Sequence, residues 1–160
     1  IETPPSYGKY HWDGHRNCNF SSSPEETKKL NGISPVCKKP MTIGVDYRVK
    51  ELENQPHGFK PKNAKPYFKL LPLHELIALT YLIKMESKKA WEVYDSLIKE
   101  FGTEFNILLN VKKEELMANK VNDKLIELIL KNREAKIKIK PGYDGEYGVA
   151  QLEEKQKTLG

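Results

Sequence analysis

Apolar residues recur at every third or fourth position through most of the second half of the chain, the spacing of one helix face. Residues that commonly begin or end helices separate these stretches, with Ser87 and Asn122 as N-caps and Gly102 as a stop. Trp91 lies on the apolar stripe of the second stretch, so we expect it in the core. The pattern predicts a bundle of roughly four to six short helices within residues 72–150. The predicted helical segments are 72–83, 88–101, 104–109, 112–118 and a last helix from 122 onward.

The first 70 residues lack this periodicity and hold eight of the ten prolines. Ser23-Pro24, followed by Glu26, has the form of a capping box, and Asn31-Gly32 ends the short helix that it begins. Residues 41–45 are predicted as a short strand, and Asp46 as the N-cap of a helix that continues through Leu52. A small α+β module is therefore expected.

The chain thus divides by composition into four parts, and its fold class is mainly α. We expect a small zinc-finger-like α+β module in residues 1–55, joined to a bundle of short helices in residues 72–150 by a basic, proline-rich linker in residues 56–71. Residues 151–160 are expected to form a flexible tail.

Composition and charge narrow the class of protein. The chain has 160 residues, of which 38% are hydrophobic, and 27 lysines and arginines against 22 acidic residues give it a net charge of +5. The sequence contains no apolar run of about 18 residues, and two cysteines are too few for a disulfide-stapled secreted scaffold. We therefore expect a cytoplasmic protein with no membrane partner. The first residue is Ile1 rather than methionine, which predicts a piece cut from a longer chain.

A module of about 50 residues buries little apolar surface and usually needs a staple. His15 and Cys18 have the ligand-x2-ligand spacing of a zinc knuckle, and Cys37 lies beyond the predicted helix. Ser34 stands where a second knuckle would carry its first cysteine, and serine is a poor zinc ligand. A structural, incomplete zinc site is favoured, with His11 or water as a possible fourth ligand. Buried free thiols or a Cys18–Cys37 disulfide are the alternatives.

Two segments are candidates for binding nucleic acid. Between Asn54 and His74 there is no acidic residue, and lysines alternate with aromatic residues, as in proteins that bind single strands. A solvated linker with docked aromatic side chains is the alternative. A second basic strip runs through residues 131–140. The candidate phosphate-binding residues are Lys60, Lys62, Lys65, Lys69, Arg133, Lys136 and Lys138.

The order of residues 108–130 is similar to that of a helix-hairpin-helix motif, which binds backbone phosphates. That motif needs a glycine in its hairpin so that backbone N–H groups can approach the phosphate. Here the connection, residues 118–122, has no glycine, so we expect the helical pair without the phosphate site.

Several blocks of the sequence resemble the endonuclease Q family, which are PHP-domain proteins often labelled UvrD-helicase-related. The most specific blocks are Tyr10-His11-Trp12-Asp13-Gly14-His15-Arg16-Asn17-Cys18 and Ile137-Lys138-Ile139-Lys140-Pro141-Gly142-Tyr143-Asp144-Gly145-Glu146-Tyr147-Gly148. Between them, residues 23–26, 32–37, 43–45, 48–52 and 59–67 continue the likeness.

The resemblance implies a catalytic PHP domain that holds metal ions, followed by a zinc module and a helical domain. It further implies DNA as the partner, with nicking beside deaminated bases such as uracil and hypoxanthine and at abasic sites. His15, Cys18 and Cys37 match the family's zinc-binding positions, whereas Ser34 departs from a cysteine.

Two functions follow as expectations. In the first, this chain is the DNA-binding and lesion-positioning part of such an endonuclease, is not catalytic alone, and contacts the PHP domain of the same polypeptide. The alternative is a protein-interaction module that docks a replication or repair partner. A stand-alone hydrolase is disfavoured, because His11, His15, His57 and His74 form no recognisable metal centre with acidic residues.

Overall fold

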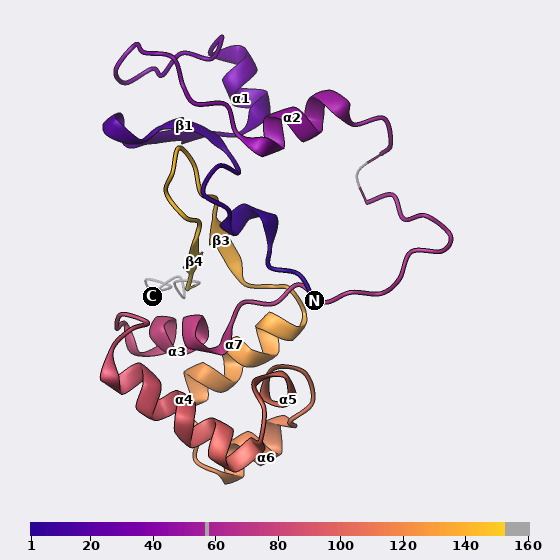
Figure 1. The fold of residues 1–160 in the computed structure, drawn as a ribbon, viewed down its shortest axis with the longest axis vertical. Helices are drawn as coiled ribbons and strands as arrows, with labels where there is room; N and C mark the ends of the chain where they lie inside the picture. Colours follow the sequence, from indigo (N-terminus) through magenta and orange to yellow (C-terminus); the bar gives the residue numbers. More distant parts are fainter. Residues whose placement is uncertain (57, 153–160) are drawn as a thin grey trace, which may run out of the picture. The chain divides into compact units, whose positions relative to one another are not determined.

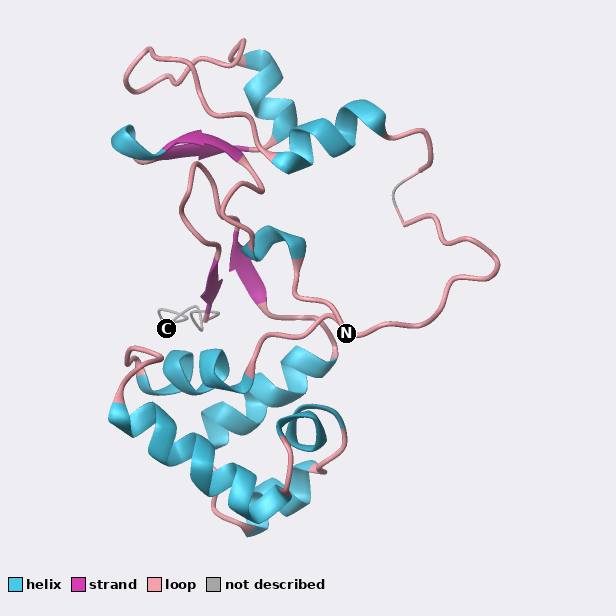
Figure 2. Ribbon diagram, in the orientation of Figure 1, coloured by secondary structure: helices cyan, strands magenta, loops and turns pink. Residues whose placement is uncertain are grey.

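The computed structural model describes residues 1–56 and 58–152, so the expected tail falls almost wholly outside the described residues. The described residues form seven α-helices and two small two-stranded sheets (Figures 1 and 2). They divide into two compact units, which are described separately. We call them the knuckle unit (Pro4–Pro66 and Ile139–Val149) and the helical unit (Ile1–Thr3, Tyr67–Lys138 and residues 150–152).

The knuckle unit is built from short elements. Its strands β1 and β2 pair antiparallel, with Gly14 opposite Ser21. Ser23 caps α1 as expected, since its Oγ accepts the N–H of Glu26 at 3.4 Å, and Asn31 and Gly32 follow the helix with φ of 51° and 71°. The elements are η1 (Pro5–Tyr7), β1 (Asp13–His15), η2 (Arg16–Cys18), β2 (Phe20–Ser22), α1 (Pro24–Lys29) and α2 (Val45–Leu52).

Two expectations for this unit are wrong. Residues 41–45 form no strand, because Thr42 makes only a single bridge to Gly14 before the chain turns into α2. The N-cap of α2 is Gly44 rather than Asp46, and the buried Asp13 carboxylate accepts the Gly44 N–H at 2.6 Å. A side chain from β1 therefore fixes the start of this helix.

Residues 139–149 return to the knuckle unit, whereas the sequence groups them with the helices. Their backbone is held by hydrogen bonds: Trp12 N–H donates to Gly142 O at 2.9 Å, and Gly142 N–H donates to Ser6 O at 2.9 Å. A Cβ at Gly142 would meet the Gly8 carbonyl, so this close approach requires glycine. The segment connects the paired strands β3 (Lys138–Lys140) and β4 (Val149–Gln151), which the sequence pattern did not predict.

The helical unit follows the predicted periodicity. Ser87 and Asn122 cap their helices through side-chain oxygens, and Gly102 ends α4 with φ of 89°. The helices are α3 (Leu73–Tyr81), α4 (Lys88–Phe101), α5 (Glu104–Leu109), α6 (Lys113–Ala118) and α7 (Asp123–Arg133). Their core consists of fully buried leucine and isoleucine side chains, among them Leu73, Leu76, Ile77, Ile107, Leu108, Leu116, Leu125 and Ile129.

One expected core residue of this unit is not buried. Trp91 is 48% exposed, and its ring meets the His74 ring edge-on with 4.1 Å between the ring centres. The Tyr94 ring stacks on the His74 ring, also with 4.1 Å between the centres. The helix stripe therefore identifies the side of α4 that faces the bundle, but Trp91 lies at its margin.

The connections on either side of α6 have the same backbone form. The N–H of Val111 donates to Asn106 O at 3.0 Å, and the N–H of Val121 donates to Leu116 O at 3.1 Å, each five residues back. In the second connection Lys120 has φ of 55°, a conformation that favours glycine. The helical pair is present, and a lysine occupies the left-handed position of its hairpin.

Within the described ranges, no helix has the length and apolar character needed to cross a membrane.

Candidate metal centre

Two short loops of the knuckle unit present the candidate ligands. Strand β1 ends at His15, and the tight turn η2 then carries Cys18 back toward it. Residues 34–37 form the second loop, in which the N–H of Lys38 donates to Ser34 O at 2.9 Å. The residues after the loops, Asn19 and Lys38, both adopt left-handed backbone, with φ of 58° and 60°. The two loops therefore have matching local geometry despite their different sequences.

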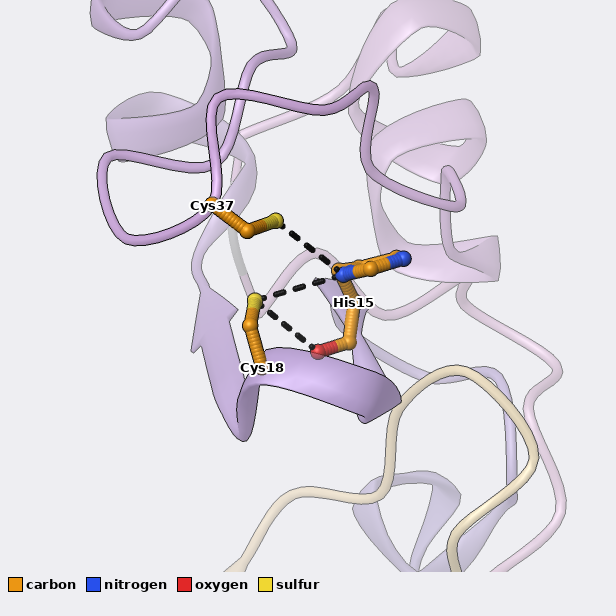
Figure 3. A group of neighbouring side chains, drawn as sticks. All are labelled: His15, Cys18 and Cys37. Atoms are coloured by element: carbon orange, nitrogen blue, oxygen red, sulfur yellow. Dashed lines mark hydrogen bonds between the residues drawn. The ribbon is translucent and has the colours of Figure 1, made fainter.

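The side chains of His15, Cys18 and Cys37 converge on one point (Figure 3). Their ligand atoms lie within 4.8 Å of one another, and His15 Nδ1 is 3.3 Å from each sulfur. Atoms that share one tetrahedral zinc ion lie about 3.5 Å apart, given Zn–N and Zn–S bonds of about 2.0 and 2.3 Å. One imidazole nitrogen and two sulfurs at this separation could hold a metal ion.

Ser34 lies beside this group and is fully buried. Its Oγ is 3.2 Å from Cys18 Sγ and accepts the N–H groups of Val36 at 3.2 Å and Cys37 at 3.5 Å. The two amides point at the side-chain atom of the first loop residue, so a thiolate at this position would receive both hydrogen bonds. The loop has the form of a complete knuckle, and only the serine oxygen departs from a four-ligand set.

The Cys37 thiol is prepared for ionisation. Its pKa is lowered from 9.0 to about 7, chiefly by the backbone N–H of Lys39. Burial opposes this effect, and Ser34, Cys18 and the nearby His15 each add a smaller lowering. Metal ions bind the thiolate rather than the thiol. The surroundings of Cys37 therefore favour its thiolate, which is the ligating form.

Asp144 anchors the first loop from a distant part of the chain. Its carboxylate accepts the backbone N–H of Arg16 at 2.7 Å and the hydroxyl of Thr42 at 2.7 Å. Arg16 directly follows the ligand His15, so this carboxylate fixes the direction in which the loop leaves β1. The sequence gives no signal for this contact, because 128 residues separate the partners.

We expect Asp144→Asn to destabilise the knuckle unit by roughly 1–2 kcal/mol at neutral pH, since an amide has a single acceptor oxygen. Burial alone would raise the pKa of the Asp144 carboxyl, but the Arg16 N–H and the Thr42 hydroxyl outweigh it, so the pKa lies below its ordinary 3.8. The charged carboxylate therefore stabilises the fold above about pH 4, and this stabilisation is lost as the pH falls through the lowered pKa. Chemical denaturation of the metal-free chain at several pH values measures both effects.

Glu146→Gln is the matched control for this prediction. Glu146 lies in the same turn, but its carboxylate is 3.9 Å from the Arg16 guanidinium, and both side chains are more than half exposed. Such a pair contributes little to stability. Equal losses in the two variants, or a loss in Asp144→Asn that persists at pH 2, would contradict the anchoring role.

The predicted phosphate-binding residues have different surroundings. Lys60, Lys62 and Lys65 lie exposed in a segment without helix or strand. Lys69 is half-buried, and its backbone forms an isolated parallel β-bridge with Glu2. Its Nζ lies 5.7 Å from the centre of the Tyr67 ring. In the helical unit, Lys136 pairs with Glu134 at 2.6 Å, and Lys138 is exposed in β3.

Arg133 has a structural function that the sequence did not indicate. Its guanidinium donates to three backbone carbonyls, those of Leu108 at 2.7 Å, Ile107 at 2.7 Å and Val111 at 2.6 Å. These carbonyls lie at the C-terminus of α5, where a helix leaves acceptors unpaired. Arg133 therefore ties α7 to the end of α5, and much of its donor capacity is already used.

The fold and the site define a small module with a candidate metal knuckle, joined in sequence to a compact helical domain. Several known proteins are similar to this chain. A family model described as the MJ0043 C-terminal domain matches residues 72–136. The protein MJ0043 of Methanocaldococcus jannaschii is 37% identical over 144 residues, which make up 90% of this chain and 18% of that protein.

Two solved structures are similar over almost the whole chain. The lesion-specific endonuclease PfuEndoQ from Pyrococcus furiosus matches with a TM-score of 0.78 and 29% identity, over 94% of this chain and 36% of that one. Endonuclease Q in complex with a 27-mer duplex substrate that has an abasic lesion at the active site matches with a TM-score of 0.77 and 29% identity, over 99% and 40%. The resemblance to the endonuclease Q family is confirmed by these two structures. The chain spans less than half the length of each of these relatives.

Proposed function

We propose that this chain is the DNA-binding and lesion-positioning part of a PHP-type DNA repair endonuclease that acts on deaminated or abasic DNA. The observation that carries the proposal is the similarity of both units to endonuclease Q, which continues over 94% to 99% of the chain. Hydrolysis of the phosphodiester bond would be performed by a catalytic PHP domain, and this chain would hold the strand in place for it.

Zinc is the metal that we propose for the centre, with His15, Cys18 and Cys37 as its ligands. Bound zinc would supply a structural cross-link between the two loops, because a nitrogen and two thiolates form a suitable donor set. Hydrogen bonds of other residues would hold the two loops in the shape that the metal needs. The Ser34 hydroxyl and the amides of Val36 and Cys37 hold the second loop in shape, and Asp144 holds the first.

The exposed lysines Lys60, Lys62 and Lys65 are proposed to contact backbone phosphates. They lie in a segment with no acidic residue, close in sequence to Phe59 and Tyr67, whose side chains are about half exposed. Lysines neutralise phosphates and release counterions, while exposed rings can stack on unpaired bases. Lys69, Lys136 and Lys138 complete the proposed set of phosphate contacts. Arg133 would support DNA binding mainly by holding α7 to the end of α5.

We expect the chain to bind DNA with a strong dependence on salt, and the triple variant Lys60→Gln, Lys62→Gln, Lys65→Gln to bind at least about tenfold more weakly at low salt. Each lost phosphate contact should lower the slope of log affinity against log salt by about 0.7 to 0.9, so the slope should fall by about 2 to 3. Fluorescence anisotropy with a labelled abasic duplex and a labelled single strand, at several salt concentrations, measures both quantities.

The control for this experiment removes the same charge elsewhere. Lys84→Gln, Lys88→Gln, Lys89→Gln changes three exposed lysines around the start of α4. Its affinity and its salt slope should remain close to those of the parent chain. A parent chain that fails to bind at low salt, or equal losses in the two triple variants, would count against the proposed DNA contacts.

A second candidate function, the docking of a protein partner, is favoured by the surface of α2. Val45, Val49 and Leu52 lie on one face of this helix and are 60%, 53% and 64% exposed. The partner proposed here is the PHP domain of the same polypeptide. Size-exclusion chromatography of the chain with a separately expressed PHP domain distinguishes the functions, since docking without any DNA binding would favour the second.

A further inference from the structure

A pocket of about 370 Å³ lies beside the metal loops, within the knuckle unit. Its polar and aromatic lining comes from two segments far apart in sequence: Arg16 and Asn19 from the first metal loop, and Lys140, Tyr143, Glu146 and Tyr147 from the returning segment. None of these residues is a candidate metal ligand or one of the lysines assigned to phosphates above. The pocket is therefore distinct from the candidate metal centre and from the proposed phosphate contacts.

The wall on the metal side is held in place by specific contacts. Tyr143 is buried, and its hydroxyl donates to Asn19 Oδ1 at 2.9 Å. The backbone of Arg16 is held by Asp144. Tyr143 also packs against Gly14 so closely that a Cβ at this glycine would clash with the ring. A fixed wall favours binding, because a ligand does not have to order it.

The lining of the pocket has two cationic side chains, Arg16 and Lys140, against one carboxylate, Glu146, and the ion pair between Arg16 and Glu146 is weak. The Arg16 guanidinium is 3.9 Å from Glu146, and their side chains are 58% and 56% exposed, a pairing worth little in water. Lys140 is exposed, and Lys9 Nζ lies 4.6 Å from the centre of the Tyr147 ring. An incoming anion can compete for the guanidinium at small cost, and Lys140 adds a second cation to the same pocket.

Tyr147 offers an aromatic surface from a fixed backbone. Its ring is 59% exposed although the following residue, Gly148, is buried and donates its N–H to Tyr7 O at 3.0 Å. A Cβ at Gly148 would meet the Ser6 carbonyl, so the chain beneath the ring is closely packed. An exposed ring on a rigid support stacks on a nucleobase at low entropic cost.

We propose that this pocket binds one nucleotide of an unpaired DNA strand, with its base on Tyr147 and its phosphate between Arg16 and Lys140. The inference rests on the proposed function for the choice of DNA as the ligand. It adds a site that discriminates unpaired from paired DNA, because a base inside a duplex cannot lie on the ring.

The first experiment uses the isolated nucleotide, so it does not depend on DNA affinity. Thymidine 5′-monophosphate is titrated into the ¹⁵N-labelled chain, with thymidine and inorganic phosphate as separate probes. We expect amide shifts at Arg16, Asn19 and Tyr147 with the nucleotide, and at least about fivefold weaker binding of either half alone, since stacking and charge act together. No shift at these residues, or phosphate binding equal to that of the nucleotide, would overturn the site.

The second experiment uses a labelled single strand. Tyr147→Leu should weaken binding by about 5- to 150-fold, the range for one lost stacking contact, with little change in salt slope. Lys140→Gln should lower that slope by about 0.7. Phe105→Leu, which changes a ring of similar exposure (57%) in the helical unit, should bind like the parent. Unchanged affinity in Tyr147→Leu would contradict the site while leaving the proposed function intact. A parent chain that binds no DNA but shifts with the nucleotide would contradict the proposed function and the choice of DNA as the ligand, while a nucleotide site at the pocket would stand.

Discussion

Ser34→Cys is expected to convert the centre into a four-ligand zinc site and to raise the zinc content to one ion per chain. The position is ready for a sulfur, because two amides, those of Val36 and Cys37, already point at Ser34 Oγ. The same atom lies 3.2 Å from Cys18 Sγ. Serine hydroxyls stay protonated near neutral pH, whereas a thiol held by two N–H groups ionises more readily. One substitution therefore adds a charged ligand without rebuilding the loop.

The expected effect on stability is large, because metal binding to the folded state is linked to folding. Zinc affinity that rises a hundredfold at fixed free zinc adds up to about 2.7 kcal/mol, which raises the melting temperature by roughly 10 °C for a domain of this size. Elemental analysis measures the zinc content, and competition with a chromophoric chelator measures the zinc affinity. Thermal unfolding with and without EDTA measures the melting temperature.

Two controls separate the ligand from the mere presence of a thiol. Ser96→Cys adds an exposed cysteine in the helical unit, which contains none of the candidate ligands, and should leave zinc content unchanged. Adding Cys37→Ser to Ser34→Cys should return the chain to the affinity of the parent. Equal zinc content in Ser34→Cys and the parent, with melting insensitive to EDTA in both, would show that the loops do not act as a zinc site.

The candidate ligands could be predicted from sequence because each loop is local. Two residues separate His15 from Cys18 and Ser34 from Cys37, so spacing alone determines which atoms can meet. The helix starts at Ser23, Ser87 and Asn122 were predicted for the same reason, since a cap joins residues within one turn.

Contacts between distant segments could not be predicted in this way. Asp144 reads as an ordinary turn residue, and nothing near it in sequence indicates the Arg16 amide that it binds. Arg133 shows the converse limit, because its charge predicts a phosphate contact but does not indicate its partners in the fold, which are carbonyls 22 to 26 residues earlier. A single sequence gives the charge of a side chain, but its partner depends on how the chain packs.

Asn132→Leu is expected to destabilise the helical unit by roughly 2–5 kcal/mol, because it leaves two buried backbone groups without partners. Asn132 is 2% exposed and pairs with both polar groups of Leu71: it accepts the Leu71 N–H at 2.9 Å and donates to the Leu71 carbonyl at 2.9 Å. Leu71 is itself buried, although the sequence places it in the linker. The Asn132 side-chain amide thus pairs with the N–H and the carbonyl of Leu71, as the backbone of a neighbouring β-strand would, and it holds the segment before α3 to α7.

A design with one fluorescent reporter assigns this effect to the helical unit. The chain has two tryptophans, and a Trp12→Phe background leaves only Trp91, which lies on α4. Urea unfolding followed through Trp91 should show the full loss for Asn132→Leu and a loss below about 1 kcal/mol for Asn119→Leu, whose exposed amide makes a single bond to Glu115 O at 3.0 Å. Asn132→Asp keeps the acceptor for the Leu71 N–H but loses the donor and buries a charge, so it should be at least as harmful as leucine. If Asn132→Leu were as stable as Asn119→Leu, apolar packing alone would hold the Leu71 segment to α7, and the paired hydrogen bonds would be dispensable.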